Sequence, residues 1–175
     1  MNAITITEVD KKHQGMAVTP LIDLFHNADG DPNVKGETTF RVKLFVTRID
    51  PPDVKEWVKG IDKKTKKFVT LKASNPVSQS LGYHIQLLCK DISTQSNSNV
   101  YKFLLYSSPD SQKEDPATEF FRGQKPENLH KNEEARKKLE EFAQTLTKFN
   151  TWVDAIVERR NGWYFIKDTK LIVAP

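Results

Sequence analysis

The stretch FNTWVDAIVERRNGWYFIKD, residues 149–168, contains one obvious turn with strand-like residues on both sides of it. In a two-residue turn centred on Asn161 and Gly162, both residues need positive φ, which these two residue types tolerate best. Counting outward from the turn places Glu158 opposite Phe165. The stretch therefore predicts a β-hairpin that is apolar on both faces and so needs cover on both.

Arginines lie beside aromatic residues at this turn, and two interpretations of them remain open. Many proteins that hold single-stranded nucleic acid combine basic and aromatic side chains in this way. Alternatively the hairpin is barrel wall, with Arg159 and Arg160 paired to Glu158 or lying over Tyr164 and Trp163. The apolar residues on both strands favour the barrel wall.

Hydrophobic patterns along the chain predict the remaining elements. The expected elements are strands at residues 38–50, 83–92 and 100–107, two short strand arms within residues 56–73, and a helix at residues 132–149. Together with the hairpin, the order is strand, strand, strand, helix, strand, strand. This is the order of the OB-fold, a five-stranded, mainly β barrel.

Residues 1–38 precede this pattern and are expected to form an arm and an extra N-terminal helix. Ile4 and Ile6 alternate with threonines as in a short strand. Pro20 suits the first position of a helix over residues 20–28. We therefore expect one OB-fold domain over residues 1–175, with a long excursion between its first two strands.

Charge is modest and local. Residues 48–72 contain eight basic and four acidic residues, which accounts for the whole net charge of +4. A dedicated nucleic-acid-binding domain usually has a broader basic face. The sharpest basic cluster is KKTKK, which predicts either a weak phosphate-contacting loop or a solvated hairpin tip. Its lysines are Lys63, Lys64, Lys66 and Lys67.

Signals of catalysis are weak. The four histidines are far apart in sequence, and none has a metal-ligand spacing with another histidine or a cysteine. The sequence has neither a glycine-rich phosphate loop nor a nucleophile elbow. Its one cysteine, Cys89, lies in an apolar run and is expected in the core. We therefore expect no enzyme activity, no cofactor, no metal and no membrane segment.

Several apolar side chains are candidates for anchoring a protein partner. A few such anchors usually carry most of the binding energy of an interface. The alternative for each is a place in the core. The candidates are Leu21 and Phe25 in the N-terminal helix, Trp57 near the excursion, and Phe120 and Phe121 in a loop-like stretch before the main helix.

Eight blocks, taken in order, closely resemble the C-terminal part of the ciliate telomere end-binding protein alpha subunits. The similarity covers residues 2–172 and departs from the family in the loops at residues 29–38, 70–82 and 107–124. The blocks are TEVDKKH, DVKEWVKG, KKTKK, NLHKN, ARKKLE, LTKFN, VERRNG and IKDTKLI.

This resemblance implies a function. Alpha subunits of the family have three OB-folds, of which the first two carry the single-stranded telomeric DNA site. The third, matched here, chiefly docks the beta subunit, which lays an extended peptide across it. The chain is thus expected to be the third OB-fold of a longer nuclear protein of telomeric chromatin. Its expected partner is the beta subunit, and the alternative is direct binding of single-stranded telomeric DNA.

Overall fold

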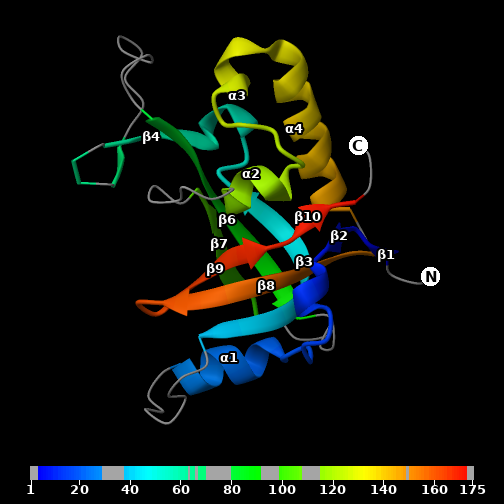
Figure 1. Ribbon diagram of the computed structural model, residues 1–175. Coiled ribbons are helices and arrows are strands. Elements are labelled where there is room, and N and C mark those ends of the chain that lie inside the picture. Colours follow the sequence, from blue (N-terminus) through cyan, green and yellow to red (C-terminus); the bar gives the residue numbers. More distant parts are fainter. Residues whose placement is uncertain are drawn as a thin grey trace.

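A computed structural model gives the structure of the chain and describes residues 4–28, 38–62, 64–65, 67–69, 80–91, 99–107, 115–148 and 150–172. In Figure 1 the barrel strands occupy the middle, with α1 below them and α3 and α4 above. The strands are β1 (Ile4–Thr5), β2 (Thr7–Glu8), β3 (Thr39–Asp50), β4 (Val58–Ile61), β5 (Phe68–Val69), β6 (Ser80–Asp91), β7 (Tyr101–Tyr106), β8 (Thr151–Arg160), β9 (Trp163–Asp168) and β10 (Lys170–Leu171). The helices are η1 (Lys11–His13), α1 (Leu21–Ala28), η2 (Val54–Glu56), α2 (Pro116–Phe120), α3 (Asn128–Lys131) and α4 (Glu133–Leu146).

Five strands pair into a closed barrel. β3 pairs antiparallel with both β6 and β8, and β6 pairs antiparallel with β7. β9 pairs antiparallel with β8 and parallel with β7, which completes the circle β3–β6–β7–β9–β8–β3. In the chain, α4 lies between the third and fourth of these strands. The arrangement confirms the predicted OB-fold.

β8 and β9 form the predicted hairpin. Asn161 and Gly162 have φ values of 53° and 81°, as a primed two-residue turn requires. Glu158 lies opposite Phe165, as the count from the turn predicted. The inward face of the hairpin joins the barrel core, where Val157 and Ile166 are buried.

The excursion between the first two barrel strands contains the two predicted arms. β4 and β5 pair antiparallel, with Gly60 opposite Val69 and Ile61 opposite Phe68. β4 also pairs with the beginning of β6, so the excursion extends the barrel sheet beyond the barrel itself. The turn between the two arms therefore projects from the edge of the strand face.

Helix α4 was also predicted. The side chain of Asn132 accepts a hydrogen bond of 3.0 Å from the amide of Glu134, which caps the helix. One face of α4 is buried in the core through Leu139, Phe142 and Leu146. None of the described helices is long and apolar enough to cross a membrane.

The segment before α3 differs from the prediction. We expected a loop there with one exposed phenylalanine, but Pro116 begins the short helix α2 instead. Both Phe120 and Phe121 are buried, with at most 1% of either residue exposed. Phe121 is inside because its ring packs against those of Trp57, Tyr83 and Phe142, with centroids 5.5, 5.2 and 6.2 Å away.

The N-terminal arm adds strands at two places. β1 pairs parallel with β8, and β2 pairs antiparallel with β10. The predicted alternation of the arm is wrong in two positions, because Ile4 is exposed and Thr7 is buried. Thr7 is held inside by its hydroxyl, which donates to the carbonyl of Asp154 and accepts from its amide, at 2.8 Å each.

A partly buried ion pair fixes the segment that follows the arm. The guanidinium of Arg41 donates to both carboxylate oxygens of Asp154, at 3.0 and 2.7 Å. This hydrogen bonding raises the pKa of Arg41. The same guanidinium donates to the carbonyls of Gln14 and Met16, which links the arm to the barrel wall. Further along, the carboxylate of Asp91 accepts a 2.7 Å bond from the amide of Leu21 at the start of α1.

Candidate functional site

The predicted partner anchors are largely core residues. Leu21, Trp57, Phe120 and Phe121 are each at most 1% exposed, so the expectation that they present an apolar surface is wrong. Trp57 stacks on Phe121 with ring centroids 5.5 Å apart. Its indole NH donates to the carbonyl of Pro51 at 2.8 Å, which removes its need for solvent.

Phe25 was predicted with these residues and lies in α1, but its side chain lies outside the described residues. Its neighbours Leu21 and Leu24 pack into the core, which settles the orientation of the helix. Ile22, between them, is 51% exposed on the outer side of α1.

The lysine cluster lies at the turn between β4 and β5. Lys64 and Lys67 are exposed, and Lys63 and Lys66 lie outside the described residues. The carboxylate of Asp62 accepts bonds from the amides of Lys64 and Thr65, at 2.7 and 3.1 Å. These bonds lower the pKa of Asp62. The turn therefore holds Lys64 and Lys67 outward at one flank of the strand face.

A row of aromatic rings crosses the outside of the barrel between this turn and the hairpin turn. The ring centroids of Phe68 and His84 lie 4.8 Å apart, and those of His84 and Tyr106 lie 4.1 Å apart. Tyr106 then contacts Phe165 edge-on at 5.7 Å. We call this row the outer aromatic face; its members are Phe68, His84, Tyr106 and Phe165. All four are partly exposed.

Strand register builds the outer aromatic face. His84 lies directly opposite Tyr106, so their rings meet on the same side of the sheet. Adjacent Tyr83 points to the other side and is buried, because successive side chains of a strand face opposite ways. Gly82 leaves the space that Phe68 needs, since a Cβ there would lie 3.2 Å from the Phe68 ring.

Charges at the rim of the outer aromatic face are partly compensated. The guanidinium of Arg160 lies 4.3 Å from the centre of the Phe165 ring and 3.0 Å from the carboxylate of Glu158. Lys167 also approaches Glu158, at 3.9 Å. Burial, and to a lesser degree the charge of Lys59, lower the pKa of His84 and so favour its neutral form.

Trp163 is the most exposed aromatic side chain near this face, with 50% of the residue exposed. The ammonium of Lys102 lies 5.6 Å from the centre of its ring. The hairpin of β8 and β9 therefore forms part of the barrel wall and also one flank of the outer aromatic face. The outward faces of the second and third barrel strands, framed by these two loops, are where OB-folds bind their ligands.

Sequence reasoning found this surface only in part. The lysine cluster and the basic and aromatic residues of the hairpin turn were recognised as candidates for phosphate contact or stacking. Phe68, His84 and Phe165 were missed. The alternation along β9 could have indicated Phe165, since it faces away from buried Tyr164 and Ile166.

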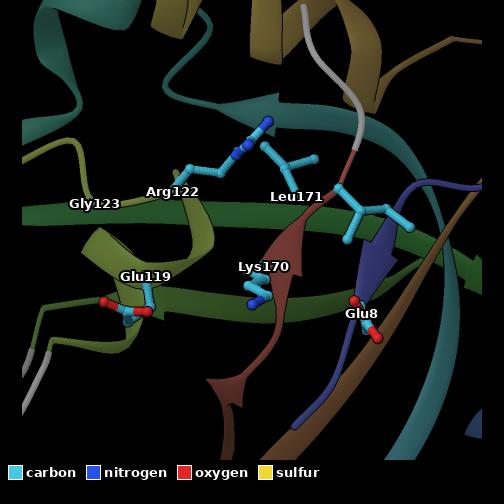
Figure 2. Close-up of a pocket in the computed structure, with 7 residues that line it drawn as sticks. Glu8, Glu119, Arg122, Gly123, Lys170 and Leu171 are labelled. Carbon is cyan, nitrogen blue, oxygen red and sulfur yellow. The ribbon is translucent and has the colours of Figure 1, made fainter.

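A pocket of about 470 Å³ lies elsewhere, between α2, β2 and β10. Figure 2 shows Glu119 and Arg122 on the α2 side, Lys170 and Leu171 on β10, and Glu8 on β2. Ile172, directly after β10, also lines it.

The chain turn at this pocket has an unusual residue. Arg122 donates its amide to the carbonyl of Glu119, and Gly123 donates to Thr118, the pattern that ends a helix with a left-handed residue. That residue is Arg122, with φ of 59°, where glycine is usual. The left-handed conformation costs roughly 1–2 kcal/mol for a residue with a Cβ.

Neither place has the ligands of a metal centre. Within the described ranges, no group of three or more His, Cys, Asp or Glu side chains could hold a metal ion. Cys89 is buried as predicted, and burial raises the pKa of its thiol. A thiol in that state is a poor nucleophile.

Comparison with known proteins gives consistent relatives, although no protein-family model matches the sequence. The chain is 52% identical to the telomere-binding protein subunit alpha of Sterkiella nova over 172 residues, which are 98% of this chain and 33% of that protein. It is 50% identical to the subunit alpha of Stylonychia mytilus, covering 98% of this chain and 34% of that protein. A telomere-binding protein homolog of Euplotes crassus is 35% identical over 77% of this chain and 26% of that protein.

Among solved structures, a chain in the crystal structure of fission yeast Pot1 and Tpz1 is similar, with a TM-score of 0.64. The match covers 98% of this chain and all of the other, at 13% identity, and at that identity it shows the fold alone. The chain spans about a third of the length of the ciliate relatives. It is thus a homologue of the telomere-binding protein alpha subunits of ciliates, corresponding to about one third of such a subunit.

Proposed function

We propose that this chain is the protein-docking OB-fold of a telomere end-binding protein alpha subunit. Its partner in the proposal is the beta subunit, in the complex that caps single-stranded telomeric DNA ends. The starting point is identity of 50–52% to proteins named as telomere-binding alpha subunits. The chain spans about a third of those proteins, and we extend their telomeric role to it. The proposal also places it in the nucleus, in telomeric chromatin, and gives it no catalytic role.

One observation carries the choice of a protein partner over DNA. The rings of the outer aromatic face pack on one another, and the stacked pair His84 and Tyr106, 4.1 Å apart, has no room for a base between them. Single-stranded nucleic acid is held by ring faces on which successive bases stack. In this chain the faces of the His84 and Tyr106 rings already stack on each other. Ring edges and the half-exposed Trp163 suit the apolar side chains of a polypeptide.

Charge supports the same choice. The guanidinium of Arg160 is engaged by Glu158 and by the ring of Phe165, so it is not a free phosphate ligand. Binding of nucleic acid depends on cations that are free to neutralise phosphates. In addition, the similar crystal structure is one of two proteins together, Pot1 and Tpz1. A partner laid across strands of this kind is one established way of recognising a peptide.

Direct binding of single-stranded DNA is the second candidate, and two observations favour it. Lys64 and Lys67 are exposed at one flank of the outer aromatic face. At the other flank, Trp163 is half exposed and has Lys102 beside its ring. A base stacked on such a ring contributes about 1–3 kcal/mol.

A paired titration tests the proposal. The 175-residue chain is titrated with purified beta subunit and, separately, with a G-rich telomeric single strand at physiological ionic strength. We expect a defined complex with the beta subunit. The oligonucleotide should bind only in the non-specific range of about 10⁻⁴–10⁻⁶ M. A nanomolar, sequence-selective DNA complex together with no beta-subunit binding would reverse the assignment.

Variants locate the binding. Trp163→Ala should weaken binding of the beta subunit by about 1–3 kcal/mol, because it removes the most exposed aromatic side chain of this surface. Lys137→Ala, on the exposed side of α4, is the control and should bind as the wild type does. Melting temperatures of both variants show whether a change in affinity reflects loss of folded protein.

A further inference from the structure

The pocket between α2, β2 and β10 is separate from the outer aromatic face and has a different character. Its floor includes Leu171, which is 1% exposed, and one wall is Ile172, which is 46% exposed. Its volume of about 470 Å³ falls in the range of protein sites that accept small ligands or a few side chains.

Charges of both signs surround the apolar floor. Lys170 lies opposite Glu8 across the two-stranded sheet of β10 and β2, and α2 contributes Glu119 and Arg122. No ion pair in the described part of the chain joins any two of these four residues. Glu8 accepts a 3.3 Å bond from the side chain of Gln14. The pocket thus presents separate acidic and basic groups to solvent (Figure 2).

Arg122 has a left-handed backbone conformation, which residues with a Cβ rarely adopt. It has φ of 59°, a conformation that glycine adopts freely, and Gly123 follows it at 86°. Its side chain is exposed and has neither a hydrogen bond nor an ion pair to another described residue. Strained backbone of this kind is concentrated at functional sites, which makes the Arg122 side chain a candidate for a binding role.

The charge pattern restricts the class of ligand. A polyanion such as single-stranded nucleic acid would place phosphates near the carboxylates of Glu8 and Glu119, which repel them. A polypeptide with neighbouring acidic and basic side chains complements both pairs of charges, and an aliphatic side chain between them fits against Ile172. We propose that this pocket binds a mixed-charge polypeptide segment and that Arg122 binds its acidic side chain through the guanidinium fork.

The proposal predicts that stability and binding change in opposite directions at Arg122. Arg122→Gly removes the backbone strain together with the guanidinium. The variant should melt a few degrees higher than the wild type. It should also bind a mixed-charge peptide at least fivefold more weakly. Lys125→Ala is the control, since it removes one exposed positive charge that does not line the pocket.

The probes are synthetic capped peptides of equal length, titrated into the isotope-labelled 175-residue chain and followed by the backbone amide signals. One peptide alternates Glu and Lys around a central Leu, one is all-acidic, one is all-basic, and inorganic phosphate is a fourth probe. We expect the mixed peptide to bind most tightly and to shift the signals of Gly123, Leu171 and Ile172. The Lys125→Ala control should bind it as the wild type does.

Three results would overturn the proposal. The first is tighter binding of the all-acidic peptide or of phosphate than of the mixed peptide, which would indicate a simple anion site. The second is a set of shifts confined to the outer aromatic face. The third is a lower melting temperature for Arg122→Gly, because Arg122 would then serve the fold.

Discussion

Two groups of aromatic rings, one buried in the core and one on the outside of the barrel, use the same residue types for different purposes. The inner aromatic cluster consists of Trp57, Tyr83, Phe121 and Phe142, all at most 3% exposed. Its rings surround Phe121, with centroid distances of 5.5 Å to Trp57 and 5.2 Å to Tyr83. The outer aromatic face is a partly exposed row on β5, β6, β7 and β9, and of the inner cluster only Tyr83 lies on one of these strands, β6.

The contrast is sharpest at two neighbours in β6. Tyr83 is buried, its hydroxyl donates to the carbonyl of Gln124 at 2.6 Å, and burial raises its pKa. His84 follows it, faces outward and stacks on Tyr106. Aromatic content alone therefore does not separate folding from binding. The side of the strand on which a ring lies does.

The largest expected effect separates the two groups by stability. Phe121→Ala should lower the free energy of unfolding by about 3–5 kcal/mol, because it leaves a cavity at the centre of the inner aromatic cluster. Phe165→Ala, in the outer aromatic face, should lower the free energy of unfolding by less, since that ring is partly exposed. Chemical denaturation of both variants measures the difference. Equal losses would remove the distinction between the two groups.

A substitution at Gly82 tests whether the outer aromatic face depends on the space that this glycine leaves for Phe68. A Cβ at this position would lie 2.8 Å from the Ile61 Cδ1 and 2.9 Å from the Ser107 Cβ. Gly82→Ala should therefore cost about 1–3 kcal/mol through overpacking.

The same variant should also displace Phe68 from His84, and the ring-proton shifts of His84 would report the displacement. Gly15→Ala is the matched control, because a Cβ there meets nothing within 4 Å. If Gly82→Ala leaves both stability and these shifts unchanged, the packing of Phe68 against β6 does not depend on the glycine.

The turn between β8 and β9 lies at one flank of the outer aromatic face. Gly162 has φ of 81°, which a β-branched residue adopts only with strain. Gly162→Val should cost at least about 1 kcal/mol, within the usual range for such strain. Gly162→Asn is the milder comparison and should cost less. A thermal melt of each variant decides, and an unchanged melting temperature for Gly162→Val would count against the primed turn.

The smallest expected effect is a pH dependence at His84. Its pKa is lowered in the folded protein, so between about 6.5 and that lower value the unfolded chain binds more protons. Stability should therefore fall as the pH falls through this window. His84→Gln should flatten this part of the curve, whereas the inner aromatic cluster should contribute nothing to it. Melting temperatures between pH 7.5 and 5 measure both; an identical slope in the variant would assign the dependence to another group.

The sequence was sufficient for the fold because its signals are local. Asn161 and Gly162 specify their own turn, and the turn fixes the register of β8 and β9. The alternation in β3 and the capped stripe of α4 are equally self-contained. The helix α2 escaped prediction because its five residues are too few for a helical pattern. The burial of Phe121 then depends on how that short helix docks.

The candidate site was predicted less well because it is assembled from distant residues. Phe68, His84 and Tyr106 come from three strands, and their contacts depend on registers that single-strand patterns do not contain. Trp57 and Phe120 were predicted as exposed anchors because composition does not show which apolar side chains the helices will cover. The lysine cluster was found easily, since it is contiguous in the chain.

The pairing of β2 with β10 has a consequence for the order of folding. Residues 7–8 find their partners only at residues 170–171, so the arm cannot complete its pairing until nearly all of this chain has left the ribosome. Contacts of such separation are slow to form, because a long loop must close before they are made. The arm is therefore expected to dock last, onto a barrel already formed by β3, β6, β7, β8 and β9. The pairing of Glu8 with Lys170, and with it that side of the pocket, would then be the last to form.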